Sequence, residues 1–194
     1  MKSPVAVTLM GLLLAACASA PVHYYSLLPA PSAPAAPRSA RYAIEILPVA
    51  VPAEADRPEW VARRADGSIE ILSGAQWAAP LDEEIRAAFA AELTGATGAP
   101  LADGLDAVHQ PVLRLKLSLR RFDIAPHQPI QIETDWSLGA PGHARLQCAE
   151  RFSARPVATD AQTLATIRQW QDALAQQIAQ TVLSWRNDVL PPCP

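Results

Sequence analysis

At residues 113–124 the chain reads LRLKLSLRRFDI, in which leucine alternates with arginine, lysine and serine. Alternation of apolar and polar side chains is the pattern of a β-strand that buries one face and leaves the other in water. The alternation slips by one place at Arg120 and Arg121, after which Phe122 resumes the apolar positions. A slip of one residue predicts a β-bulge at this point of the strand.

Two more alternating stretches follow, and the charges on their polar faces predict how the three strands pair. IQIETDWSL at residues 130–138 carries acidic side chains on its polar face, and ARLQCAERF at residues 144–152 carries arginine there. The inward positions of the third stretch begin at Ala144 and include Cys148. Opposite charges on neighbouring strands stabilise a sheet by roughly 0.2–1 kcal/mol per pair. The acidic strand is therefore predicted to lie between the two basic ones, in an antiparallel meander that turns at residues 139–142.

Two amphipathic helices are expected, at residues 80–93 and 159–185. The first opens with a proline, has acidic side chains in its first turn, repeats an apolar side chain every fourth residue and meets a glycine stop at Gly95. The second begins at Thr159 with the spacing of a capping box and follows a near-heptad apolar stripe, which Gln171 interrupts. Both stripes should cover the inner face of the sheet.

The residues before the first helix predict a strand and a β-hairpin. Alternation at residues 42–47, with the even-numbered residues on one side, predicts a strand that Pro48 ends or confines to a sheet edge. An Asp-Gly pair at residues 66–67 is a tight-turn signal between two runs, and Gly74 is expected to close this hairpin. The predicted fold is α+β, a mostly antiparallel sheet with two helices packed on one face, in a domain that spans residues 41–190.

The start of the chain resembles the signal of an exported lipoprotein. A basic start and a short apolar run, too short to span a bilayer, precede LAAC at residues 14–17, which is similar to a bacterial lipobox. This resemblance implies removal of residues 1–16, a diacylglycerol thioether on Cys17, and acylation of the new amino terminus by a fatty acid such as palmitate. Two or more acyl chains hold a soluble domain stably on a membrane. Ala18, in place of aspartate, points to the periplasm-facing side of the outer membrane; the alternative is an ordinary secretory signal.

Residues 17–40 are rich in proline and alanine, which predicts an extended tether that lifts the domain off the lipid surface. HYYSL at residues 23–27 interrupts this composition. Tyr24 and Tyr25, with the leucine that follows, form either a short strand docked on the domain or a contact site for a partner. The docked strand is the favoured interpretation.

Composition and charge exclude several classes of protein. The formal net charge is −3, and it becomes −4 once Lys2 is removed with the signal. A mildly acidic body argues against binding to nucleic acid and against a basic membrane-binding patch. The hydrophobic fraction of 50% owes much to alanine, and no apolar run after the signal is long enough to cross a bilayer.

Residues that could carry chemistry are few. The four histidines show no metal-ligand spacing, and the phosphate-binding and nucleophile motifs do not occur, so we expect no enzyme activity, no metal and no cofactor. Cys148 and Cys193 fit no zinc or redox motif. An oxidising compartment would favour a disulfide between them, and the alternative is two free thiols.

The order and spacing of several motifs resemble those of the ABC-type transport auxiliary lipoproteins, the group that includes the paraquat-inducible lipoprotein of envelope lipid transport. The residues that carry the resemblance are Cys17, YYSL at 24–27, ILPV at 46–49, DRP at 56–58 with WVAR at 60–63, QWAAPL at 76–81, WSL at 136–138 and the Ala/Gln-rich closing helix. One departure is AEA at residues 53–55, where the family would have a more apolar loop that contains tyrosine.

The resemblance implies a non-catalytic subunit that is anchored in the outer membrane and docks a periplasmic substrate-binding protein of the mammalian-cell-entry type. Through that protein it would work with an ABC permease and ATPase. The candidate partner-contact residues are Tyr24, Tyr25, Arg57 and Trp77. Two alternatives stay open, a stand-alone envelope lipoprotein that acts as a binding or inhibitor module, and a hydrolase. The unpaired edge of the strand before Pro48 is compatible with a homo-oligomer.

Overall fold

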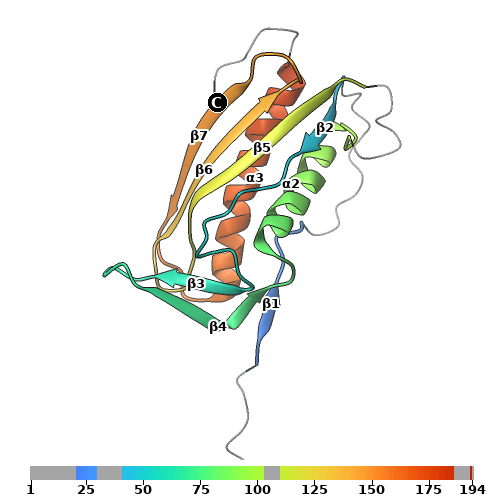
Figure 1. Cartoon of the computed structure of the whole chain (residues 1–194). Coiled ribbons are helices and arrows are strands. Elements are labelled where there is room, and N and C mark those ends of the chain that lie inside the picture. The colour runs from blue at the N-terminus through green and yellow to red at the C-terminus, as the bar shows by residue number, and fades with distance from the viewer. Residues whose placement is uncertain (1–20, 30–40, 103–109, 186–192, 194) are drawn as a thin grey trace, which may run out of the picture.

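The computed structural model describes residues 21–29, 41–102, 110–185 and 193. The elements in chain order are β1 (His23–Tyr25), β2 (Ala43–Ile46), β3 (Glu59–Arg63), β4 (Ile69–Trp77), α2 (Leu81–Thr97), β5 (Val112–Asp123), β6 (Ile130–Gly139), β7 (Leu146–Ala154) and α3 (Asp160–Ser184). They form a four-stranded sheet in the order β2-β5-β6-β7 and a three-stranded sheet in the order β1-β4-β3. Both helices cover one face of the larger sheet, and the smaller sheet lies across one end of the molecule (Figure 1). The predicted α+β class is confirmed.

The larger sheet contains the predicted meander. β6 pairs antiparallel with β5 on one side and with β7 on the other. Glu133 stands opposite Arg121 on β5 and Arg151 on β7, and Arg120 forms an ion pair with Asp135 at 3.0 Å on the water-exposed face. The acidic strand therefore lies between the two basic ones. Because these pairs are exposed, each contributes at most about 1 kcal/mol, and they select the strand order more than they add stability.

The predicted bulge in β5 is present. The register with β6 shifts between Leu119 and Arg121, so that Arg120 has no partner position across the ladder. The leucines before the shift and Phe122 after it are all buried against the helices. The prediction for the third strand is wrong at its start, because Ala144 is exposed and β7 begins only at Leu146. Residues 140–145 are used by the turn that returns the chain from Gly139.

β2 lies at the edge of the larger sheet and runs parallel to β5. It ends at Ile46, before Pro48, as expected. The predicted alternation is wrong in part, since Ala43 is as fully buried as Ile44. A backbone segment also covers the outer edge of β2: the Ile44 amide donates to the Pro100 carbonyl, and the Ala102 amide donates to the Ile44 carbonyl. The edge is therefore not free along Ile44, and it gives no support to a homo-oligomer there.

The first helix runs further than predicted. α2 continues through Gly95 and ends at Gly98, which has φ of 69° and donates its amide to the Thr94 carbonyl. The left-handed conformation of a helix C-cap favours glycine, and the sequence offers two glycines three residues apart. The stop predicted at Gly95 is wrong because Gly98 takes that role.

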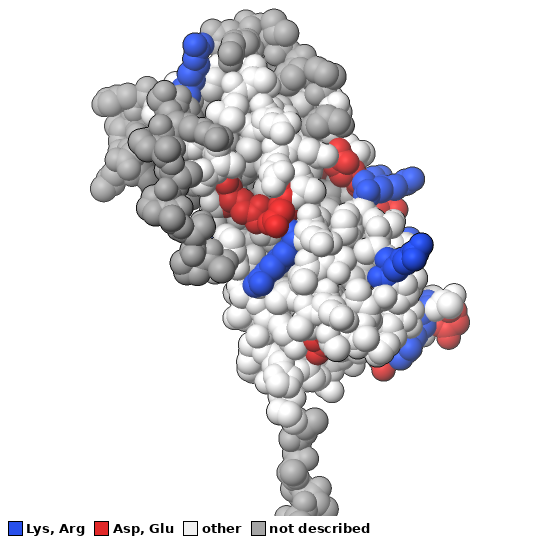
Figure 2. Space-filling view, turned by 180° about the vertical axis from the view of Figure 1, so that it is seen from behind, with Lys and Arg blue, Asp and Glu red and all other residues white. Residues whose placement is uncertain are grey.

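The second helix follows its prediction closely. Thr159 caps α3 by accepting a hydrogen bond from the Gln162 amide at 3.2 Å, and the Gln162 side chain accepts from the Ala158 amide at 2.9 Å. The apolar stripe is buried from Ile167 to Trp185. The outer side of the helix layer shows few charged side chains, and on α3 it consists mainly of alanine and glutamine (Figure 2).

The smaller sheet contains the predicted hairpin, with Gly67 at φ of 87° in its turn. Gly74 does not close it, because β4 continues to Trp77 and pairs in parallel with β1. The docked strand expected at residues 23–27 is thus present, and folded structure begins at His23, before the boundary expected at Arg41. None of the helices in the described ranges combines the length and apolarity that crossing a bilayer requires.

Candidate functional site

A set of buried side-chain hydrogen bonds from two helices holds the segment that follows β1. Leu27 is 0% exposed and belongs to the main hydrophobic core. The carboxylate of Glu84, itself buried on α2, accepts one hydrogen bond from the Leu27 amide and one from the Ser26 hydroxyl, both at 2.8 Å. A buried carboxylate is costly unless its oxygens are hydrogen-bonded, so this contact strongly favours one position of the segment.

The second helix holds the same segment from its other side. The Arg168 guanidinium donates to the Ser26 carbonyl at 2.8 Å, and the Gln171 amide donates to the Leu27 carbonyl at 3.3 Å. We call this arrangement the clamp: Ser26 and Leu27 held by Glu84, Arg168 and Gln171. Side chains of two helices thus form hydrogen bonds with the carbonyls of Ser26 and Leu27 and with the Leu27 amide. These backbone groups are satisfied although neither residue belongs to a strand.

Tyr25 extends the clamp to the start of α3 and to the smaller sheet. Its hydroxyl donates to Asp160 at 3.2 Å, and its ring lies 4.7 Å from the Trp60 ring, measured between centroids. Burial, together with the neighbouring carboxylate of Asp160, raises the pKa of the Tyr25 hydroxyl. The phenol therefore stays protonated and remains a hydrogen-bond donor.

An aromatic chain continues from Tyr25 through the core. Successive ring centroids are 4.7 to 6.3 Å apart, within the range of favourable aromatic packing. Its members are Tyr25, Trp60, Trp77, Phe122, Trp170 and Phe89. The chain touches both sheets and both helices, so the docked segment is packed against the centre of the molecule.

The four candidate contact residues gather at one end of the smaller sheet, in different environments. Tyr24 is 67% exposed and faces Gln76 in register, and Gln76 in turn faces Glu59 on β3. Arg57 forms an ion pair with Glu59 at 3.1 Å. We call the surface formed by Tyr24, Arg57, Glu59 and Gln76 the partner patch.

Tyr25 and Trp77 lie beneath this surface. They are partners in the β1–β4 register, Tyr25 is half-buried, and Trp77 is only 4% exposed. Both pack on Trp60. Trp77 is thus a core residue that supports the patch from below.

The clamp contains the residues that sequence reasoning missed. Glu84 was expected to complement the dipole at the start of the helix, and Arg168 had no assigned role. The signal that could have identified the site is Gln171, a polar residue in an apolar stripe, because such a residue requires a polar partner when the stripe is buried.

A second carboxylate near the clamp has a perturbed ionisation. Burial and the nearby Asp172 carboxylate raise the pKa of Glu92 to about 7, although a hydrogen bond from Gln171 acts in the opposite direction. Glu92 is a residue of α2, and its side chain faces α3, where Gln171 donates a hydrogen bond to it. Its ionisation is therefore coupled to the packing of the two helices around the clamp.

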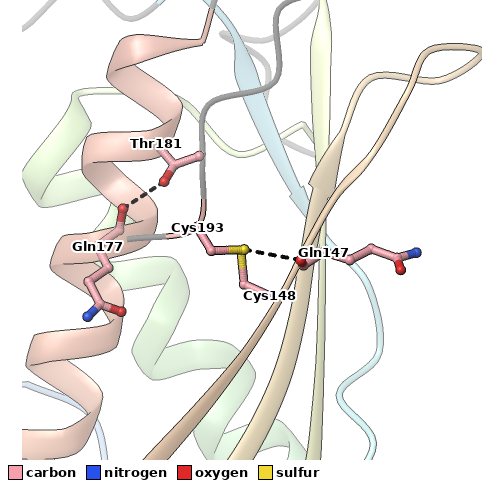
Figure 3. The surroundings of a disulfide bond; sticks show 5 residues. All are labelled: Gln147, Cys148, Gln177, Thr181 and Cys193. Atoms are coloured by element: carbon pink, nitrogen blue, oxygen red, sulfur yellow. Dashed lines mark hydrogen bonds between the residues drawn. A yellow bond between two sulfur atoms is a disulfide. The ribbon is translucent and has the colours of Figure 1, made fainter.

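At the opposite end of the larger sheet, the structure joins Cys148 of β7 to Cys193 by a disulfide, with Cα atoms 5.7 Å apart (Figure 3). The Cys193 sulfur also lies 3.1 Å from the Gln147 carbonyl oxygen. A disulfide sulfur carries no hydrogen, so this is a close contact and not a donated hydrogen bond. Cys17, the predicted lipidation site, lies outside the described residues.

A shallow cleft of about 330 Å³ lies between the turn of the hairpin and the end of β5, and Arg63, Arg64 and Arg121 help to line it. Arg63 donates to Asp123 at 3.0 Å, Arg121 also pairs with Asp123, and Arg64 pairs with Glu70. Each guanidinium thus has a carboxylate partner. No group of histidine, cysteine and acidic side chains in the described ranges is arranged to hold a metal ion.

Comparisons with known proteins agree with this fold. Residues 25–179 match the family model described as ABC-type transport auxiliary lipoprotein component. A crystal structure of an uncharacterised protein is similar, with a TM-score of 0.65, 19% identity, and coverage of 83% of this chain and 98% of the other. A Xanthomonas campestris protein of the DUF330 family has a TM-score of 0.59 and 17% identity, with 82% and 95% covered. No curated protein sequence matches this chain.

Proposed function

Because this chain belongs to the ABC-type transport auxiliary lipoprotein components, we propose that it is a non-catalytic lipoprotein subunit of an envelope lipid transport system. Acylated Cys17 anchors it to the periplasmic side of the outer membrane. Its folded domain docks a substrate-binding protein of the mammalian-cell-entry type. That protein works with an inner-membrane permease and an ATPase, which supply the energy.

The clamp is the observation that carries this proposal. Only five residues separate Cys17 from His23, and the chain is fixed to both helices by Ser26 and Leu27. A long flexible tether would allow the domain a wide range of distances from the membrane and of orientations. A short link that leads into a clamped segment restricts both the distance of the domain from the membrane and its orientation. A subunit that holds another protein at a defined place needs such a restriction.

The partner patch is the contact surface that we assign to the docked protein. Tyr24 offers a large, rigid, amphipathic side chain, and Arg57 offers a planar guanidinium beside it, two residue types that are enriched where proteins bind each other. Trp77 supports the patch from below through Trp60. The proposed contact thus rests on the same aromatic packing as the clamp.

Crosslinking in living cells tests this assignment. A photo-crosslinking amino acid at Tyr24 should capture the mammalian-cell-entry protein, and the same amino acid at Gln180, an exposed position on α3, should capture much less of it. If position 24 captures no such protein although the chain is anchored and folded, the chain is a stand-alone binding or inhibitor lipoprotein and the proposal is wrong.

A further inference from the structure

We infer that the tip of the β3–β4 hairpin, residues 64–71, rests in the lipid headgroup layer of the leaflet that holds the anchor. This inference rests on the proposed function, because it requires acylated Cys17. Only the hairpin tip contacts lipid. Tyr24 and Arg57 remain in the partner patch, which lies at the other end of β4, beside Gln76.

The length of the link limits how far the domain can be from the membrane. Six residue steps join Cys17 to His23, and a fully extended chain covers roughly 20 Å over that length. The expected tether of residues 17–40 is therefore replaced by a much shorter one, since β1 already docks at residue 23. The end of the molecule that contains β1 must lie close to the lipid surface.

The hairpin lies at this same end. β4 is hydrogen-bonded to β1, with Ala75 opposite His23, and the hairpin extends across the end of the molecule where β1 begins (Figure 1). Ile71 and Ile69 are four and six residues before Ala75, which at strand spacing is about 13 and 20 Å. The distance from the tip to the start of β1 is thus no greater than the length of the extended link.

The side chains of the tip suit a lipid surface. Ile69 is 39% exposed and Ile71 is 46% exposed. They are two of only six large hydrophobic side chains that are exposed in the described residues. Val22, which belongs to the link between Cys17 and β1, is another of these six side chains. Exposed apolar side chains next to an acyl anchor add buried area to the same membrane contact.

The charges of the tip indicate which lipids it prefers. Arg64 is paired with Glu70, and hydrogen bonds from Ser68 lower the pKa of Asp66, so that Asp66 is ionised at neutral pH. The tip therefore has no excess of positive charge. Contact through Ile69 and Ile71 should not need anionic lipid, in contrast to a polybasic membrane-binding segment.

Site-directed spin labelling of the full lipoprotein in phosphatidylcholine vesicles tests the inference. A nitroxide is attached at Ile71→Cys, and the matched control is Leu183→Cys on the last turn of α3, where the native leucine is 41% exposed. Cys148 and Cys193 are joined and do not react with the label. The ratio of collision rates with oxygen and with a water-soluble nickel chelate reports depth in the membrane. We expect this ratio to be several-fold higher at position 71 than at position 183.

Two results of the labelling experiment would overturn the inference. Equal ratios at the two positions would place the tip in water. A fall in both collision rates at position 71 would mean that a second copy or another protein covers it. Mass spectrometry of the same sample separates the two proposals: acylated protein with a water-exposed tip rejects the tip contact alone, whereas unacylated protein rejects the proposed function as well.

Discussion

Leu27 and Leu28 are neighbours in the sequence, yet Leu27 is 0% exposed and Leu28 is 47% exposed. The difference arises because the clamp holds the backbone of Leu27 between two helices, while Leu28 points to solvent. Substitutions at these two residues therefore distinguish the effect of packing in the core from the effect of removing any apolar side chain of this segment.

Replacement of Leu27 by alanine should lower the free energy of unfolding by ~2–5 kcal/mol, since it leaves a cavity in the core. The matched change Leu28→Ala should cost no more than about 0.5 kcal/mol. Chemical denaturation followed by tryptophan fluorescence measures both. Equal effects of the two substitutions would mean that the segment is not packed as described.

Glu92 gives the fold a predictable pH dependence. Its pKa is raised to about 7 in the folded chain from an ordinary value of 4.5. Between these values the unfolded chain releases the proton and the folded chain keeps it, so the free energy of unfolding falls as the pH rises from 4.5 to 7. We expect Glu92→Gln to flatten this slope in unfolding curves measured across the window.

Glu83, an exposed residue on the same helix, supplies the control for this experiment. It pairs with Arg86 at the surface, so Glu83→Gln should leave the slope almost unchanged. A Glu92→Gln variant whose pH dependence matches that of the native chain would contradict the assignment.

Glu84 shows why the clamp could not be predicted at the level of single residues. An acidic side chain in the first turn of a helix is already explained by the helix dipole, so nothing in its position requires a buried partner. Its partners are Ser26 and Leu27, more than fifty residues earlier in the chain. The tyrosine-containing segment and Gln171 were each singled out from the sequence, but their contact is not local.

At the scale of elements, the sequence predicted best where the determinants are local. The bulge at Arg120 and the order of β5, β6 and β7 follow from alternation and from charge signs on adjacent strands. The predictions fail where a segment far away in the sequence determines where a strand ends or whether its edge is covered. β4 passes Gly74 because β1 pairs with it, and the outer edge of β2 is covered because backbone at Pro100 and Ala102 is hydrogen-bonded to Ile44.

The disulfide links β7 to the residues that follow α3, across a sequence separation of 45. Closing a loop of this length restricts the unfolded chain by ~4 kcal/mol at 25 °C in the chain-entropy estimate. We expect reduction to lower the free energy of unfolding by about 2–4 kcal/mol. Guanidinium denaturation with and without reductant measures this effect.

The Cys148→Ser, Cys193→Ser double variant is the control for the disulfide. It should unfold like the reduced native chain and should not respond to reductant. If reductant leaves the unfolding of the native chain unchanged, the bond does not contribute to stability in solution.

At the scale of the whole molecule, the α+β class and the one-sided helix layer were predicted correctly. The division into two sheets was not, because it depends on the parallel pairs β1–β4 and β2–β5. Each of these pairs joins strands about fifty or more residues apart, and a short strand such as β1 carries little periodic signal of its own. The same pairing leaves only a short link between Cys17 and the folded domain, where the sequence predicted a long tether.

The short link and the clamp have a role in positioning only if the chain is held at an acylated Cys17. Intact-mass spectrometry of the mature protein purified from membranes tests this directly. We predict a chain that begins at Cys17 and carries a diacylglyceryl group on its sulfur and a fatty acyl group on its amino nitrogen. An unmodified amino terminus, or a mature chain that begins at any other residue, would contradict the account.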